Sequence, residues 1–104
     1  MEILDKQAFE NAIKTDKLAL IDFFASWCMP CKMLSPILES LQSKYEGKIS
    51  FAKLDIDKEE DIAREYDIYS VPTLLLFKKG EKVGMSIGYK SADELIEFLD
   101  SYLD

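Results

Sequence analysis

The chain has 104 residues, which fits a single domain over residues 1–104 that buries about two thirds of its unfolded surface. Apolar residues make up 48% of it, which argues against a disordered chain. It carries 13 Lys and Arg against 20 Asp and Glu, a net charge of -7, so neither nucleic acid nor an anionic membrane is expected as a partner.

The first half of the chain alternates strand and helix patterns. An edge strand is predicted at Ile3-Leu4, followed by a helix that Asp5 caps and that ends near Thr15. The run Leu18–Ala25 is almost continuously apolar, which is typical of a strand covered on both faces. After Cys28, apolar residues recur at helical spacing, at Leu34, Ile37, Leu38, Leu41 and Tyr45.

The second half predicts two more helices, one more central strand and a hairpin. After Gly47, which is expected to end the second helix, Ile49–Leu54 is a strand and Glu59–Tyr66 a short helix. The segments Thr73–Phe77 and Lys82–Ile87 form a hairpin, and the capping box Ser91-Ala92-Asp93-Glu94 opens the last helix. This order predicts an α/β fold with a central mixed five-stranded sheet flanked by four helices.

The start of the chain lacks the pattern of a secretory signal peptide. The longest apolar stretch, Leu18–Ala25, is too short to span a bilayer and contains Asp22. We therefore expect a cytoplasmic location. In that reducing compartment, a close pair of cysteines is more often catalytic or metal-binding than structural.

The two cysteines lie in the segment Trp27-Cys28-Met29-Pro30-Cys31-Lys32. Two cysteines placed at random in this chain would have this spacing about 2% of the time, so the spacing alone is only suggestive. Cys28 stands between a buried strand and a helix, where the free N–H groups of the first turn favour a thiolate. Cys31, one turn further, is expected to be more buried. The pattern predicts that Cys28 attacks and Cys31 resolves.

Three other interpretations of the pair remain open at this point. A Cys-x-x-Cys is half of many zinc sites, but the chain has no other Cys and no His to complete four N/S ligands. A structural disulfide across so small a loop contributes little stability. Two inert core cysteines are the third alternative.

The chain resembles the thioredoxin family over essentially its whole length. The resemblance is carried in one collinear order by the stretches Ile21–Lys32, Pro36, Ala52–Asp57, Val71–Phe77 and Gly88. It implies a thioredoxin fold and a protein-disulfide reductase that works by dithiol–disulfide exchange. It also implies no bound cofactor and no metal, and the sequence has no Gly-rich dinucleotide-binding motif.

Four residues outside the pair gain roles from the resemblance. Asp22 is a carboxylate inside an apolar strand, where desolvation raises its pKa. The matching family Asp lies beneath the thiols and moves the proton of the buried Cys, and Lys53 matches the Lys that pairs with it. About 5% of X-Pro bonds are cis, but the residue matching Pro72 is cis and stands against the thiols. Val71 would then offer its backbone to an extended substrate.

An apolar substrate-binding surface around the thiols is also implied. Its expected members are Trp27, Met29, Pro30, Val71, Gly88, Tyr89 and Ile56. The chain departs from the common family pattern at Met29, where Gly is usual, at Phe24, where Trp is common, and at Tyr89, where a small residue is usual. Met29 lies between the cysteines and therefore bears on the redox potential.

The partners implied by the resemblance are a thioredoxin reductase and disulfide-containing proteins such as peroxiredoxins, ribonucleotide reductase and methionine sulfoxide reductase. The protein is expected to act as a monomer. One alternative is an oxidase or isomerase with the same fold, which the missing export signal and Pro30 argue against. The other is a binding module that does no redox work.

Overall fold

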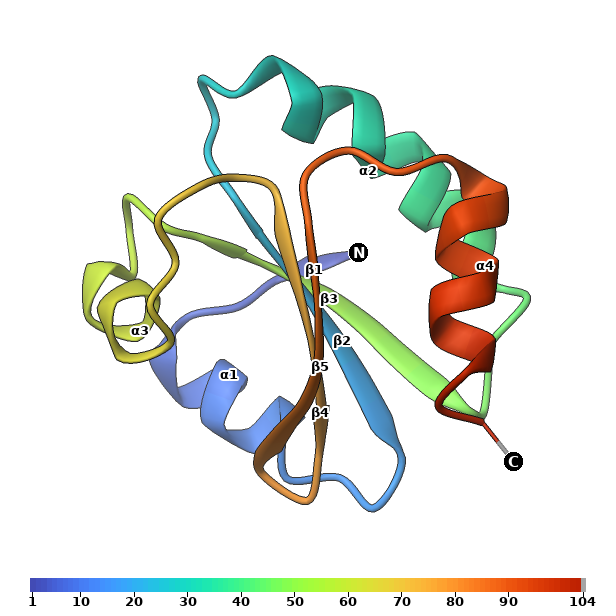
Figure 1. Ribbon diagram of the computed structural model, residues 1–104. Helices are drawn as coiled ribbons and strands as arrows, with labels where there is room; N and C mark the ends of the chain where they lie inside the picture. The colour runs from blue at the N-terminus through green and yellow to red at the C-terminus, as the bar shows by residue number, and fades with distance from the viewer. Residues whose placement is uncertain (104) are drawn as a thin grey trace.

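The computed structural model describes residues 1–103. Strands and helices alternate along the chain up to β4, which is followed by a hairpin partner, β5, and a last helix (Figure 1). The elements are β1 (Glu2–Ile3), α1 (Lys6–Ala12), β2 (Leu18–Phe24), α2 (Met29–Gln42), β3 (Ile49–Asp55), α3 (Glu60–Glu65), β4 (Thr73–Lys78), β5 (Glu81–Ile87) and α4 (Ala92–Asp100). All nine predicted elements are present, within a few residues of the expected positions.

The strands form one mixed sheet in the order β1-β3-β2-β4-β5. β3 runs parallel to β1 and β2, whereas β4 runs antiparallel to both β2 and β5. The short β1 therefore lies at an edge and β2 at the centre, as the sequence predicts. Because β2 has a neighbour on each side, its backbone is among the most protected in the molecule.

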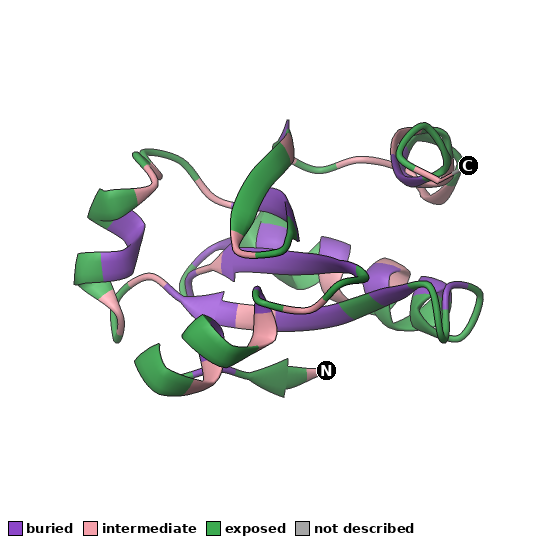
Figure 2. Ribbon diagram, turned by 90° about the horizontal axis from the view of Figure 1, so that it is seen from below, coloured by how far each residue is buried: buried purple, intermediate pink, exposed green. Residues whose placement is uncertain are grey.

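Each face of the sheet carries its own hydrophobic core (Figures 1 and 2). Alternate residues of a strand point to opposite faces, so β2 sends Leu18 and Leu20 to one core and Ile21 and Phe23 to the other. The helices α2 and α4 cover the first core, and α1 and α3 cover the second. This double cover explains why β2 is apolar along nearly its whole length.

Two side-chain caps are confirmed. The Asp5 carboxylate accepts the N–H of Ala8 at 2.8 Å, and Ser91 and Glu94 form both hydrogen bonds of the capping box. Each satisfies N–H groups that the first turn of a helix leaves free. These helix starts could be predicted because their causes lie within four residues.

Two helices end earlier than predicted. α1 stops at Ala12, near which the carbonyl groups of Ile13 and Thr15 accept the N–H groups of Gly80 and Lys79, at 2.7 and 3.0 Å. The β4–β5 turn thus takes the acceptors that a longer helix would use. α2 stops at Gln42, before Tyr45.

Tyr45 is buried beyond the end of α2, and its hydroxyl donates to the Asp100 carboxylate on α4 at 2.8 Å. Gly47 follows with φ +83°, a left-handed conformation that suits glycine. Within the described residues, every helix is too short or too polar to cross a membrane.

Candidate active site

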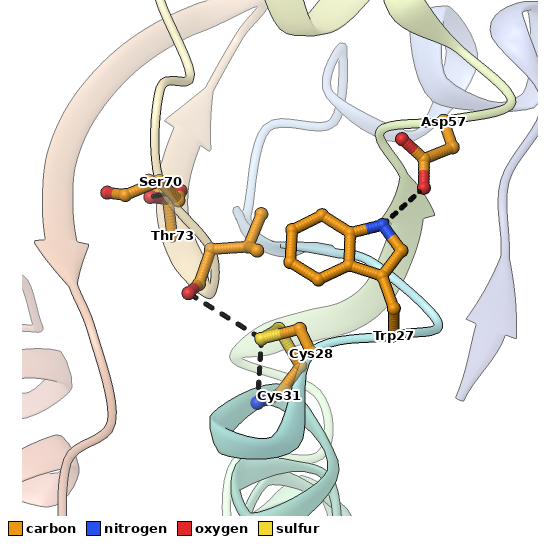
Figure 3. Close-up of a disulfide and its surroundings, with 7 residues drawn as sticks. Trp27, Cys28, Cys31, Asp57, Ser70 and Thr73 are labelled. Carbon is orange, nitrogen blue, oxygen red and sulfur yellow. Dashed lines mark hydrogen bonds between the residues drawn. A yellow bond between two sulfur atoms is a disulfide. The ribbon is translucent and has the colours of Figure 1, made fainter.

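The two cysteines lie where the carboxyl end of β2 leads into α2. They form a disulfide with their Cα atoms 5.3 Å apart (Figure 3). Cys28 is the N-cap of α2, and the backbone N–H of Cys31 donates to its Sγ at 3.2 Å. Pro30 occupies the first turn, where a residue without an N–H costs nothing. The predicted position of Cys28 at the helix start is confirmed.

Both cysteine residues are buried to the same degree, each with 4% of its surface exposed. The expectation that Cys31 is the more buried of the two is therefore wrong for this state. The physical reason is that the bonded sulfur atoms cover each other, and that Ile56 and Val71 pack over the pair. The difference between the two sulfurs lies in their neighbours instead.

The loop before β4 closes over Cys28. The Val71–Pro72 peptide bond is cis, and the Val71 carbonyl oxygen lies 3.6 Å from the Sγ of Cys28. The Thr73 hydroxyl donates to the Ser70 carbonyl at 2.7 Å, which links the two ends of the segment that holds the cis bond. The expected cis bond and its place against the thiol pair are both confirmed.

Asp22 lies inside the sheet, with 1% of its surface exposed. Among residues 1–103, neither of its carboxylate oxygens has a hydrogen-bond partner. Burial raises the pKa of Asp22 from 3.8 to about 7, and the charge of Lys53 opposes this rise in part. The carboxyl group can therefore gain and lose a proton near neutral pH.

Lys53 stands directly opposite Asp22 in the parallel β2–β3 ladder. Its ammonium group donates to the Ser35 hydroxyl at 3.2 Å and lies 4.4 Å from the centre of the Phe24 ring. The resemblance implies a Lys53–Asp22 pair, but no hydrogen bond joins the two in the described part of the chain. The ammonium group is hydrogen-bonded to Ser35 and lies over the Phe24 ring instead.

A cleft of about 470 Å³ opens beside Cys31 and Lys53. Its lining comes from the end of β2, the first turns of α2 and one residue of β3, and includes Lys32, Ser35 and Glu39. The cleft gives solvent a route toward the disulfide from the side of α2.

The residues expected to bind substrate lie on the surface around the disulfide. The side chains of Trp27 and Met29 are 68% and 62% exposed, Pro30 and Tyr89 are also exposed, and Ile56 is half-buried against the cysteines. The N–H of Gly88 donates to the Pro72 carbonyl at 2.8 Å, which brings the end of β5 to this loop. Within residues 1–103, Tyr89 is not among the side chains that pack against the two cysteines.

Sequence reasoning missed three side chains here. Asp57 accepts the indole N–H of Trp27 at 2.8 Å (Figure 3). Tyr69 is 90% exposed and lines a shallow pocket with Ile56 and Asp57. Ser35 accepts a hydrogen bond from Lys53. Asp57 ends the family-like stretch Ala52–Asp57, which is the one signal that pointed to it. Within residues 1–103, no three Cys, Asp or Glu side chains are grouped as metal ligands would be.

Comparison with known proteins agrees with this geometry. The thioredoxin family model matches residues 1–101. Thioredoxins of Staphylococcus aureus, including those of strains Mu50, MW2 and USA300, are 45% identical over 95 residues, which is 91% of this chain and 90% of each relative. The likeness therefore includes every element that builds the site.

Proposed function

The chain belongs to the thioredoxin family, and from this premise we propose which of its residues carry each step of the reaction. As a member it is a thiol–disulfide oxidoreductase, a protein-disulfide reductase with a Cys-x-x-Cys redox pair. Its fold is the thioredoxin fold that the sequence predicts. The observation that carries our assignment is the sulfur of Cys28, which caps α2 and accepts the Cys31 N–H.

In the reduced protein, Cys28 attacks. The Cys31 N–H and the start of α2 stabilise a thiolate at Cys28. This thiolate attacks one sulfur of a substrate disulfide, a Cys28–substrate bond forms, and the other substrate sulfur leaves as a thiolate that takes a proton from water. Cys31 then loses its proton and attacks the Cys28 sulfur. The second substrate thiolate leaves, so two electrons have passed from the cysteine pair to the substrate.

We propose that Asp22 accepts the proton that Cys31 loses. A buried carboxylate without a hydrogen-bond partner is a ready acceptor, and a pKa of about 7 matches a base that works near neutral pH. Lys53, in register with Asp22, supplies the positive charge that keeps this base ionisable. Its role is electrostatic.

The substrate docks on the surface formed by Trp27, Met29, Pro30, Ile56, Val71, Gly88 and Tyr89. An extended substrate segment adds to the Val71 backbone beside Pro72, and the exposed indole of Trp27 gives it apolar contact. The Trp27–Asp57 hydrogen bond fixes the orientation of that indole.

Thioredoxins are recharged by a thioredoxin reductase and act on disulfide-containing proteins, and family membership implies both partners here. The finer assignments are proposals: peroxiredoxins, ribonucleotide reductase and methionine sulfoxide reductase as substrates, a monomer built as a single domain over residues 1–104, and a cytoplasmic location.

A Cys31→Ser variant tests the assignment of the two cysteines. Without its resolving thiol, the variant should keep substrate proteins bound to Cys28 by a mixed disulfide that dithiothreitol releases. The matched control is Cys28→Ser, which should retain none. If Cys31→Ser retains no disulfide-bonded model protein, or if Cys28→Ser retains as much, then Cys28 is not the attacking residue.

A further inference from the structure

Ser35 connects the active-site helix to the charged residue beneath it. It lies on α2 four residues after Cys31, so both point to the same side of the helix. Its half-buried side chain lines the cleft and accepts a hydrogen bond from the Lys53 ammonium group at 3.2 Å. None of the substrate-binding surface described above touches this side of the site.

The Lys53 ammonium group is held from two directions. Ser35 provides an oxygen, and the face of the Phe24 ring, 4.4 Å away, attracts the cation through the π system. The carboxyl group of Asp22 is the alternative partner, because it is opposite Lys53 in the ladder and both of its oxygens are free. Adjacent strands are about 4.8 Å apart, so a small movement of the flexible Lys stem would bring the two charges together.

We propose that Ser35 is a positioning residue: with Phe24, its hydroxyl holds the Lys53 ammonium group off the Asp22 carboxyl, which stays free to accept the proton of Cys31. This inference rests on the proposed function for its mechanistic meaning. Its physical content, that Ser35 determines how strongly Lys53 acts on Asp22, can be measured without any substrate.

The other groups near Asp22 do not supply this control. On α2 the cleft carries Lys32 and Glu39, both exposed, and the cysteines are bonded to each other. On β4 the residue opposite Asp22 is Leu74, which has no charge. Lys53 on β3 is thus the charged side chain in register with Asp22, and Ser35 is its hydrogen-bond acceptor in the described chain.

The test measures the pKa of Asp22 in the disulfide form. The titration is monitored through the side-chain carbonyl signal in NMR, or through infrared difference spectra against Asp22→Asn. In Ser35→Ala, Lys53 turns to the carboxylate, and the pKa of Asp22 falls by about 1 or more, as an adjacent opposite charge produces. Ser35→Thr, which keeps the hydroxyl, should titrate as the parent protein does. Ser40→Ala, an exposed serine of α2 whose hydroxyl bonds the Ile37 carbonyl, is the matched control.

The Ser35→Ala substitution made in a Lys53→Met variant shows whether Ser35 acts through Lys53. Lys53→Met keeps the apolar stem and removes the charge, so adding Ser35→Ala to it should leave the pKa of Asp22 unchanged. The proposal is overturned if Ser35→Ala alone leaves that pKa where it is, or if its effect persists in Lys53→Met. The rate of mixed-disulfide resolution against pH is measured separately. If Ser35→Ala shifts the pKa of Asp22 but leaves the pH dependence of the resolution rate unchanged, Ser35 keeps its positioning role and Asp22 is refuted as the base.

Discussion

The buried carboxyl group of Asp22 should lower the stability of the oxidised protein as pH rises. Its pKa is 3.8 in an unfolded chain and about 7 in the folded one. Each pKa unit corresponds to about 1.4 kcal/mol, so ionising Asp22 in place lowers the free energy of unfolding by about 4 kcal/mol. The folded state binds more protons than the unfolded state between these two values. Stability contributed by the protonated form is therefore complete below about pH 4 and is lost as pH rises to about 7.

The perturbation is Asp22→Asn, which has the shape of the protonated acid and does not titrate. The variant and the parent should be about equally stable near pH 4, and the variant should be the more stable by about 4 kcal/mol above pH 7. The assay is urea unfolding of both disulfide forms across this range. Subtracting the free energy of unfolding of the parent from that of the variant cancels the contributions of all other titrating groups.

The control is Asp16→Asn, which removes one exposed negative charge between α1 and β2. Its effect should not follow the same pH course. A difference between Asp22→Asn and the parent that is constant with pH would refute the reasoning, because it would mean that Asp22 ionises as easily in the fold as in the unfolded chain.

Four further outcomes are expected. Asp22→Asn should slow the release of substrate from the mixed disulfide by about 100-fold at pH 7, the low end for loss of a positioned base, as measured by single-turnover kinetics; an unchanged rate would count against Asp22. Leu95→Ala removes a buried side chain of α4 from the core and should lower the free energy of unfolding by about 2 to 5 kcal/mol. Ser91→Ala removes the capping box and should lower it by about 1 kcal/mol. Both are measured by urea unfolding. Trp27→Ala should raise the KM for a disulfide-bonded protein and change the unfolding free energy little, because the side chain is 68% exposed; an unchanged KM would place docking elsewhere.

The features that could be predicted from sequence have causes close along the chain. The apolar run around Ile21 predicts a central strand, and Asp5 and Ser91 predict helix starts, because the groups that they cap lie within four residues. The cysteine pair could be predicted for the same reason, because it lies between the end of one strand and the start of the next helix.

The features that were missed depend on residues far apart. α2 ends before Tyr45, whose hydroxyl bonds Asp100, 55 residues away, and a helical pattern contains no sign of this contact. Trp27 and Asp57 are 30 residues apart, and Ser35 and Lys53 are 18. Such partners become visible only when the strand order is known.

The cleft beside Cys31 gives water its own route to the disulfide. It shares no residue with the proposed substrate-binding surface, so the same disulfide has two separate approaches. A volume of about 470 Å³ has room for on the order of ten water molecules. A partner that covers only Trp27 and Val71 leaves the cleft open, so water still reaches the side of the disulfide on which Cys31 lies. Docking and proton transfer therefore need not compete for one opening.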